Sequence, residues 1–452
     1  MFGLNEKCSV VGVFNVPEAA KFAYFSLFSM QHRGQEAAGI ASSDGEKIHI
    51  VKNRGLVTQV FDEEKLKLLV GESAVGHTRY STAGEDSVLD AQPIFARYDL
   101  GQIAVVHNGN LTNAKEVRHE LIKEGAIFQT FMDTENLIHL IARSSHEQLY
   151  DRIIEALHRI EGAYSLVFLS RKKMFAVRDP HGFRPLSMAK LGDGWVVASE
   201  TCAFDLIGAE YVRDIRPGEL VVFEKDKEPR SIQVFEPTPH KCIFEYIYFA
   251  RPDSLIFGKS VYELRKAMGR ELAKELPVEA DMVVPVPDSG VAAALGYAQE
   301  SGIPFELGII RNHYVGRTFI EPTQAIRDLK VKMKLNPIKE VIKGKRLVVI
   351  DDSIVRGTTS KKIVNILKEF GAKEVHMRIS APPTTGPCYY GVDTPTKEEL
   401  IASKMSVEET REYIGADSLA YLSIEGLLRS VGNDQSYCMA CFDGNYPVEN
   451  KN

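Results

Sequence analysis

The 452-residue sequence has only six cysteines, one tryptophan, no excess of basic residues and no long apolar run. So few cysteines exclude the disulfide framework of a small secreted protein. The net charge of −6 argues against nucleic acid as a general partner. Even the apolar stretch at residues 22–30 is far too short to cross a membrane. What remains is a globular chain long enough for two or three domains.

The first residues, MFGLNEKCSVVGVF, also lack the cationic start, the apolar core and the cleavage site of a secretory signal. We therefore expect a cytoplasmic protein. In that compartment cysteines are more often catalytic or metal-binding than cross-linked, which makes the six that are present worth following.

Short β-favouring segments dominate the first half of the chain, at residues 47–51, 74–80, 103–107, 163–169, 174–177 and 195–198. A helix is predicted after Pro17, with three aromatic side chains on one side, Phe22, Phe25 and Phe28. A second helix is predicted from Asn113, in a capping box with Glu116, to Gly125. Runs of strands with a few covering helices predict a layered α+β domain.

A charged, proline-containing segment at residues 224–240 predicts a domain boundary. Beyond it, the predicted strands at 281–286, 345–350 and 374–379 alternate with predicted helices at 292–300 and 359–370. This βαβ order predicts a parallel sheet. The tail from Ser430 is polar and contains a CxxC element.

The most informative segment is KRLVVIDDSIVRGTTS, residues 345–360. Its almost continuously apolar strand ends in the acid pair Asp351 and Asp352, and a glycine-containing loop leads to Thr358 and Thr359, which can cap a helix. Ligands of open α/β sheets bind at the carboxyl ends of strands, and a helix N-terminus suits a phosphate. Adjacent carboxylates can hold sugar hydroxyls or Mg²⁺. Two acids alone would favour a plain βαβ turn with acids on the surface.

The complete string resembles the phosphoribosyl pyrophosphate motif of the type I phosphoribosyltransferases. The resemblance implies an α/β domain that binds this substrate and one Mg²⁺ through Asp351, Asp352, Ser353, Arg356, Gly357, Thr358 and Thr359. VPVPDSG, residues 284–290, resembles the pyrophosphate loop of these enzymes, which implies that Ser289 contacts magnesium or pyrophosphate. By itself this signal is weak, because Pro, Asp, Ser and Gly are also the residues that commonly form turns. The basic stretch at 311–334 includes Arg317 and is either a solvated loop or a lid over the polyanion.

In the first half, Cys8 precedes a β-like run and by itself would most often be a core residue. Four further segments follow it, QHRGQEAAGI, GHTRYST, HNGN and DTE. Together and in this order they resemble the glutaminase domain of the class II amidotransferases, which are N-terminal-nucleophile hydrolases built as an αββα sandwich. The resemblance implies that Cys8 attacks glutamine and that its own α-amino group, with an unperturbed pKa of about 8, is the base. Residues 1–7 would then be a propeptide that is removed.

The same resemblance assigns the other glutaminase residues: Asn108 and the backbone N–H of Gly109 as oxyanion donors, Arg79 for the glutamine α-carboxylate, Asp133 for the α-ammonium, and Arg33 and Gly34 in the loop that closes over glutamine. One position departs from the usual pattern, because Ser9 stands where relatives have glycine. We expect only a subtle effect from so small a side chain.

Four of the remaining cysteines have the spacing of metal ligands. Cys438 and Cys441 form a CxxC pair, and two distant cysteines, Cys242 and Cys388, can complete an all-thiolate site. Zinc and a [4Fe–4S] cluster are hard to separate on these residues alone. The four positions resemble the cluster ligands of the iron–sulfur-containing amidophosphoribosyltransferases, which implies one structural [4Fe–4S] cluster per subunit. Cys202 has no partner in view, and we expect it in a core.

The resemblance to the amidophosphoribosyltransferases extends over nearly the whole sequence. It implies a glutaminase domain over 8–235, a phosphoribosyltransferase domain over 236–430 and a C-terminal segment, 431–452, with the CxxC. The implied reaction, the first committed step of purine synthesis, converts glutamine, water and phosphoribosyl pyrophosphate into 5-phosphoribosylamine, glutamate and pyrophosphate, with Mg²⁺ on the leaving group. We expect a homo-oligomer, a dimer or tetramer, inhibited by purine nucleotides, without nucleic-acid or membrane partners.

Two alternatives make distinct demands on the sequence. An amidotransferase with a sugar isomerase or ATP-pyrophosphatase half would need that fold or an SGG-type ATP loop, and neither motif occurs in the sequence. A regulatory binding protein without catalysis would lack the nucleophile or the acid pair, and both are present.

Overall fold

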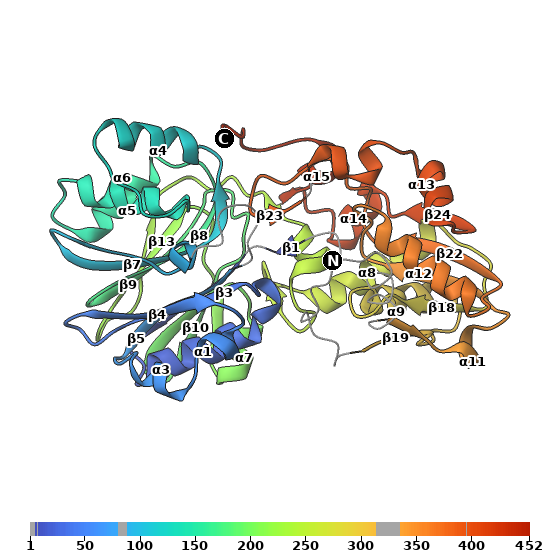
Figure 1. The fold of residues 1–452 in the computed structure, drawn as a ribbon, viewed down its shortest axis with the longest axis horizontal. Coiled ribbons are helices and arrows are strands. Elements are labelled where there is room, and N and C mark those ends of the chain that lie inside the picture. Colours follow the sequence, from blue (N-terminus) through green and yellow to red (C-terminus); the bar gives the residue numbers. More distant parts are fainter. Residues whose placement is uncertain (1–4, 7, 80–87, 313–334, 395) are drawn as a thin grey trace.

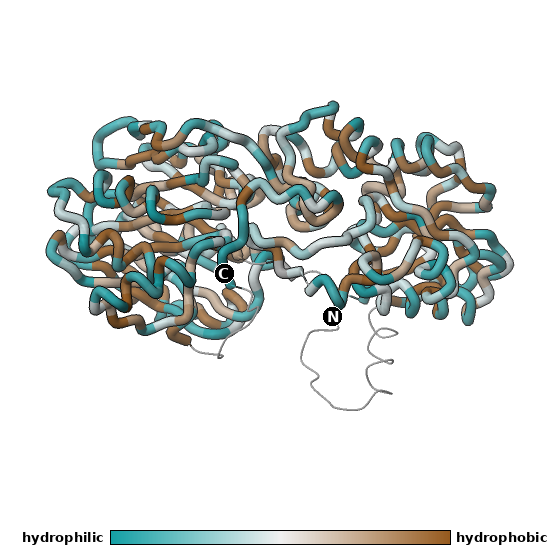
Figure 2. Tube along the Cα trace, turned by 90° about the horizontal axis from the view of Figure 1, so that it is seen from above, coloured by the Kyte–Doolittle hydropathy of each residue, from teal (hydrophilic) through white to brown (hydrophobic). Residues whose placement is uncertain are grey.

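The computed structural model describes residues 5–6, 8–79, 88–312, 335–394 and 396–452. The chain forms two bodies side by side, the first from the blue and green half of the sequence and the second from the yellow and red half (Figure 1). Apolar segments run through both bodies (Figure 2), and each has buried clusters of its own. Among the described residues, no helix is both long and apolar enough to cross a membrane.

Two antiparallel sheets form the centre of the first body. One has the strand order β12 (Glu210–Asp214), β10 (Ser187–Leu191), β11 (Gly194–Ala198), β2 (Ser9–Phe14), β5 (Ser73–Arg79), β3 (Ala37–Ser43) and β4 (Ile48–Arg54). The other has the order β14 (Arg230–Gln233), β13 (Glu219–Glu224), β9 (Lys173–Arg178), β8 (Gly162–Ser170), β7 (Gly101–Leu111) and β6 (Ile94–Tyr98). Apolar residues that alternate along β2, β5, β7 and β8 meet between the sheets.

Helices cover the outer face of each sheet and complete four layers. Helices α1 (Ala19–Ser29) and α7 (Cys202–Ile207) share a buried cluster with the first sheet, and α2 (Val57–Val60) and α3 (Glu63–Lys67) lie nearby. Helices α5 (Thr134–Arg143) and α6 (Leu149–Leu157) cover the second sheet, next to α4 (Ala114–Lys123). This αββα arrangement confirms the predicted fold class of the first half.

Two local details differ from the sequence-based expectation. Asn113 precedes α4, but its side-chain oxygen accepts from the backbone N–H of Glu161 at 2.9 Å and not from Glu116, so the predicted capping box was wrong. In α1 the small residues face the sheet, while Phe25 and Phe28 are about half exposed, at 48% and 49%. Strand β14 falls inside the segment predicted as a domain boundary, where it pairs with β13 as the edge strand of the second sheet.

The second body is built on a parallel sheet of four strands, β18 (Met282–Pro285), β21 (Arg346–Asp351), β22 (Glu374–Ile379) and β24 (Ser418–Tyr421). Helices α8 (Val261–Glu275) and α9 (Val291–Ser301) pack on one face, and α12 (Thr358–Glu369) and α13 (Val407–Ile414) pack on the other. The predicted parallel sheet is therefore confirmed. Helix α14 (Ile424–Ser430) lies against α8, and the short α11 (Lys339–Ile342) precedes β21.

Short strand pairs tie remote parts of the chain together. Strands β19 (Ile309–Arg311) and β20 (Leu335–Pro337) pair on either side of residues that the structure does not describe. Strand β15 (Lys241–Cys242) pairs in parallel with β25 (Tyr437–Cys438), and β1 (Asn5–Glu6) pairs with β23 (Val392–Asp393). After α15 (Ala440–Asp443) the tail returns to the first body, where the N–H of Lys451 donates to the carbonyl of Thr112 at 2.8 Å.

Candidate active sites and a four-cysteine cavity

Cys8 is buried at the start of β2, where the first body meets the second. Its backbone N–H donates to the carbonyl of Arg33 at 3.2 Å, and its own carbonyl accepts from Arg33 Nε at 3.2 Å. Its φ of 135° is unusual for a residue other than glycine. One residue of the short helix Gln31–Arg33 thus holds the backbone of Cys8 from both sides.

Arg33 is fully buried among charged partners. Its Nη1 and Nη2 donate to Glu245 Oε2 and Oε1 at 2.9 and 2.8 Å, and Nη1 also donates to Glu200. Burial alone would raise the pKa of Glu200, but attraction to His32 and Arg33 outweighs it and holds that pKa well below its ordinary value. The sequence predicted that Arg33 and Gly34 belong to the loop that closes over glutamine, and the guanidinium of Arg33 lies against the Cys8 carbonyl and two carboxylates.

The predicted oxyanion donors lie on β7, across from β8. A Cβ on Gly109 would stand 2.0 Å from the carbonyl oxygen of Ala163, so only glycine fits this close approach. Asn108 Nδ2 lies 3.4 Å from the hydroxyl of Ser199, and its buried Oδ1 has no hydrogen-bond partner among the described residues. The same hydroxyl accepts from Val10 N at 3.0 Å, which ties Asn108 to β2, the strand that directly follows Cys8.

The residues predicted to bind the ends of glutamine lie nearby in the fold. Arg79 ends β5, donates from Nη1 to the carbonyl of Asp90 at 2.9 Å and adjoins the undescribed residues 80–87. Gly34 crosses this strand so closely that a Cβ would lie 2.6 Å from the backbone of Thr78. Ser9, which stands where relatives have glycine, is accommodated in the fold because its hydroxyl hydrogen-bonds to that of Thr78 at 2.6 Å.

Asp133 precedes α5 and is the candidate for the α-ammonium. It accepts from the N–H of Leu111 at 3.0 Å and from the hydroxyl of Thr134 at 3.2 Å, and His107 Nδ1 lies 3.5 Å away. Burial by itself would raise the pKa of Asp133, but attraction to His107 and these hydrogen bonds lower it to about 2. Asp133 is therefore a carboxylate at any pH at which the protein works.

In the second body, Asp351 and Asp352 lie buried at the carboxyl end of β21, as the motif predicted. Burial raises the pKa of both carboxyls, and for Asp351 the charge of Asp352 raises it further. Hydrogen bonding from Ser289 acts in the opposite direction on both, so the structure brings Ser289 to the acid pair. Ser353 also donates its hydroxyl to Asp352 Oδ1 at 2.5 Å.

The rest of the motif forms the start of α12. Gly357 precedes the helix at a left-handed φ of 71°, and Thr358 is its first residue. No side-chain cap occurs there, so the predicted cap by Thr358 or Thr359 was wrong and the first amides of the helix stay available to an anion. Arg356, which was expected to bind the substrate, forms an ion pair in this structure between its Nη2 and Glu399 Oε1 at 3.0 Å.

The predicted lid is described only at its base. Arg311 Nη1 pairs with Asp288 Oδ2 of the VPVPDSG loop at 2.6 Å, so β19 lies beside that loop. Arg317 and most of the basic stretch fall outside the described residues.

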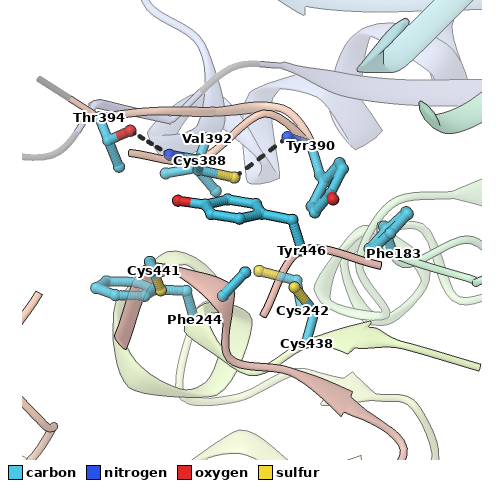
Figure 3. Close-up of a pocket in the computed structure, with 11 residues that line it drawn as sticks. Phe183, Cys242, Phe244, Cys388, Tyr390, Val392, Thr394, Cys438, Cys441 and Tyr446 are labelled. Carbon is cyan, nitrogen blue, oxygen red and sulfur yellow. Dashed lines mark hydrogen bonds between the residues drawn. The ribbon is translucent and has the colours of Figure 1, made fainter. Parts of the chain in front are cut away.

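The four cysteines with metal-ligand spacing line one cavity (Figure 3). Cys242 and Cys438 are direct partners in the β15–β25 pair, and the N–H of Tyr390 donates to Cys388 Sγ at 3.3 Å. Burial raises the pKa of the Cys242 thiol to about 12 and that of Cys441 well above its ordinary value. Cys202 lies elsewhere, in the cluster beneath α7, as expected for a core cysteine.

The spacing of the sulfurs bears on what this cavity could hold. Around one zinc ion, bonds of about 2.3 Å would bring the four sulfurs within about 4 Å of each other. Among the described residues, no group of three or more Cys, His, Asp or Glu side chains is close enough together to hold a single metal ion. An iron–sulfur cluster spreads its ligands further apart than a single ion does, because iron and sulfide lie between them.

Several functional contacts have no signal in the sequence. The ion pairs of Arg33 with Glu245 and Glu200 join residues separated by 212 and 167 positions. Asn110, next to the oxyanion donors, reaches the carbonyl of Tyr389 in the second body at 3.0 Å. Such pairs cannot be predicted from the sequence, because neither partner stands out from the other residues of its own segment.

Comparison with known proteins agrees with this two-site architecture. Residues 77–205 match the glutamine amidotransferase domain family, and residues 259–398 match the phosphoribosyl transferase domain family. The fold and both sites therefore define a glutamine amidotransferase joined to a phosphoribosyltransferase.

Relatives that match almost the whole chain identify the particular enzyme. Amidophosphoribosyltransferase 1, chloroplastic, of Arabidopsis thaliana is 55% identical over 98% of this chain and 79% of its own length. The amidophosphoribosyltransferase of Bacillus subtilis is 50% identical over 99% and 95%. The solved Bacillus subtilis glutamine phosphoribosylpyrophosphate amidotransferase complexed with ADP and GMP superposes with a TM-score of 0.93, at 49% identity over 98% of both chains. A structure described as the allosteric regulatory enzyme of purine biosynthesis gives 0.94, at 50% identity over 98% and 97%.

This chain belongs to the amidophosphoribosyltransferase family. It is a glutamine phosphoribosyl pyrophosphate amidotransferase of purine biosynthesis, and glutamine and phosphoribosyl pyrophosphate are its substrates.

Proposed function

We propose that Cys8, exposed as the first residue by removal of residues 1–7, is the nucleophile that releases ammonia from glutamine. Its Sγ attacks the side-chain amide carbon, while the freed α-amino group accepts the thiol proton and passes it to the leaving ammonia. Water then hydrolyses the thioester to glutamate. The observation that supports this most strongly is the position of Cys8 directly before β2, because Val10 of that strand is tied through Ser199 to Asn108 on the neighbouring sheet.

Around this nucleophile, Asn108 Nδ2 and the N–H of Gly109 would donate to the oxyanion. Arg79 would bind the α-carboxylate, Gly34 would allow the close approach of its own segment to that strand, and Asp133 would bind the α-ammonium. The low pKa of Asp133 supports its role, because the carboxylate stays charged.

In the second domain, ammonia would attack C1 of phosphoribosyl pyrophosphate as pyrophosphate leaves. Asp351 and Asp352 would hold the ribose hydroxyls and, with Ser289, the Mg²⁺ ion, and their raised pKa values support a site that needs a cation. Bound Mg²⁺ would supply charge neutralisation of the leaving pyrophosphate. The first amides of α12, together with Ser353, Thr358 and Thr359, would bind the 5-phosphate. Arg356 and Arg317 would also bind the substrate.

The cavity of Cys242, Cys388, Cys438 and Cys441 would hold one [4Fe–4S] cluster. The four thiols that line one cavity support this assignment, and the resemblance of their positions to the cluster ligands of the iron–sulfur-containing branch favours the cluster over zinc. The group would supply four covalent links among the interdomain segment, the loop before β23 and the tail.

Wider properties of the enzyme stay predictions. Inhibition by purine nucleotides is proposed because the solved Bacillus subtilis relative is complexed with ADP and GMP. A cytoplasmic location and a dimeric or tetrameric assembly rest on the sequence alone.

One comparison of nitrogen sources tests the division of labour. Cys8→Ala removes the proposed nucleophile and leaves the second domain whole, so glutamine-dependent synthesis should fall by several orders of magnitude. Synthesis from free ammonia, measured at alkaline pH where NH₃ is abundant, should largely persist. Loss of both reactions in a folded variant would contradict separate sites. Intact-mass measurement of the active enzyme should give a chain that begins at Cys8.

A further inference from the structure

Four buried charged side chains join the two domains, and one of them, Arg33, contacts the backbone of Cys8. Arg33, Arg184, Glu200 and Glu245 are each at most 1% exposed. The first three belong to the glutaminase domain, whereas Glu245 opens the π-helix Glu245–Phe249 at the entry to the second domain. Two positive and two negative groups balance one another, which is what burial of charge requires.

Glu245 fixes Arg33 with more than one bond. Its two oxygens accept from Arg33 Nη1 and Nη2 at 2.9 and 2.8 Å, and Oε1 also accepts from Arg184 Nη2 at 2.6 Å. A bidentate contact of this kind sets the plane of the guanidinium as well as its position.

The third nitrogen of the Arg33 guanidinium, Nε, faces the backbone of the proposed nucleophile. Arg33 Nε donates to the carbonyl of Cys8 at 3.2 Å, while the carbonyl of Arg33 accepts from Cys8 N at 3.2 Å. Any displacement of Arg33 therefore moves the backbone of Cys8. Once residues 1–7 are removed, Cys8 N is an amine, and a hydrogen bond from it to this carbonyl restricts its rotation about the N–Cα bond.

Glu200 makes the reverse connection. It belongs to the glutaminase domain but accepts, through Oε2, from Arg251 N at 2.9 Å and from the Ser254 hydroxyl at 2.8 Å in the second domain. The domain boundary is thus crossed in both directions by carboxylates that also bind Arg33. A buried ion network adds little net stability over apolar packing, but it specifies one register between the parts that it joins.

We propose that Glu245 is a positioning residue for glutamine hydrolysis, supplied by the second domain. Through Arg33 it sets the orientation of the Cys8 amine and thiol, so the glutaminase site is complete only when the two domains are docked in this register. The inference rests on the proposed role of Cys8 as nucleophile and extends it to a residue that touches neither substrate.

Glu245→Gln tests the proposal in the full-length, cluster-containing enzyme. The substitution keeps the shape of the side chain but removes its charge and one of its two acceptor oxygens. We expect kcat for glutamine-dependent synthesis to fall about 10- to 100-fold, because small misplacements of a reacting group cost this much. Ammonia-dependent synthesis should stay within about threefold. Activity is expressed per chain that begins at Cys8, as determined by intact mass.

Two further readouts separate positioning from general damage. Labelling of Cys8 by the glutamine analogue 6-diazo-5-oxo-L-norleucine should slow in parallel with kcat, and the pH profile of glutamine-dependent kcat/KM should shift, because the orientation of the amine that acts as base has changed. A merely structural role would change neither while ammonia-dependent synthesis persists.

Matched variants complete the experiment. Glu219→Gln removes an equally buried carboxylate that is bidentate to Arg213, within the glutaminase domain, and should leave the ratio of the two reactions unchanged. If Glu245→Gln does not fold, Glu245→Asp keeps the charge and should show a smaller loss in glutamine-dependent synthesis alone. Equal loss in both reactions, or loss in neither, overturns the proposal. Cys8→Ala run in parallel identifies which idea fails, because retained glutamine use there contradicts the nucleophile and not Glu245.

Discussion

At the scale of single residues, the fold shifts the pKa of carboxyl groups in both candidate sites, downward in the first and upward in the second. Asp133 is held charged by His107 and by hydrogen bonds from Leu111 and Thr134. Asp351 and Asp352 are buried side by side, and burial raises the pKa of both carboxyls. The first environment suits a ligand ammonium, and the second suits a metal bound together with a polyanion.

Asp133 should contribute stability that depends on pH. Its folded pKa of about 2 lies below the ordinary 3.8, so its contribution is present above pH 4 and is lost as the pH falls toward 2. The shift corresponds to about 2 kcal/mol at neutral pH. Asp133→Asn should therefore lower the thermal midpoint at pH 7, and the difference from wild type should shrink below pH 4. A difference that is constant with pH would show that the lost stability does not come from ionisation.

The acid pair predicts the opposite dependence and a metal effect. Because the folded pKa values are raised, the stability associated with this pair is present below pH 4 and is lost as the pH rises through the folded values. Mg²⁺ should raise the thermal midpoint at pH 7.5 and have little effect at pH 4.5. Asp352→Asn should remove most of that gain and should weaken phosphoribosyl transfer from glutamine and from ammonia alike.

Asp281→Asn is the control for this experiment, because Asp281 pairs with Arg346 at the opposite end of the same strands. Normal transfer from ammonia by both Asp351→Asn and Asp352→Asn would mean that the acid pair is not part of the site.

At the scale of elements, a two-residue strand pair brings the cysteine ligands together. The β15–β25 pair sets Cys242 opposite Cys438, although the two lie almost 200 positions apart. So short a pair has little stability of its own. Covalent links through a cluster would supply what the hydrogen bonds do not.

The cysteine cavity predicts a brown protein with about four irons per chain when it is purified without oxygen. Cys438→Ser should lose iron and lower the thermal midpoint, while the remaining folded enzyme keeps most of its ammonia-dependent activity. Cys202→Ser changes a buried cysteine outside the cavity and should keep its iron. Stoichiometric zinc without iron in metal analysis would contradict the assignment.

At the scale of the whole molecule, the second domain contacts the glutaminase site in more than one place. Asn110 Nδ2 donates to the carbonyl of Tyr389, and a Cβ on Gly391 would lie 3.0 Å from Gly109. The chain end closes the same edge, because Asn452 Nδ2 donates to the carbonyl of Leu111. The predicted oxyanion donors are thus packed against the other domain.

These contacts predict that phosphoribosyl pyrophosphate stimulates glutamine hydrolysis. A substrate that orders the second domain should stabilise the neighbouring oxyanion donors, and coupling of this kind is typically about 5- to 150-fold. Asn110→Ala should reduce the stimulation and leave ammonia-dependent synthesis intact.

Asn113→Ala provides the comparison, because its side-chain hydrogen bonds, to Arg159 and Glu161, lie within the glutaminase domain. Glutamine hydrolysis that is unaffected by phosphoribosyl pyrophosphate in wild type would contradict the coupling.

Features that depend on neighbours along the chain could be predicted before the fold was known. The strand–acid–glycine–helix order of residues 345–360 predicted β21 and α12, because a buried strand and the turn after it are encoded in consecutive residues. The β-favouring residues of β2 and β7 likewise predicted strands, and the order of the motifs predicted two domains and the family.

The contacts between segments that are distant in sequence could not be predicted in this way and are seen only in the folded chain. Arg33 carries no mark that it faces Glu245, and the aromatic side of α1 gives no sign that small residues occupy the buried side. Asn113 had a local partner available in Glu116 but bonds to Glu161. Buried charges and amides have no water to bond with, so they must find partners within the protein. Which partners are available depends on which segments pack together and not on which residues follow one another in the sequence.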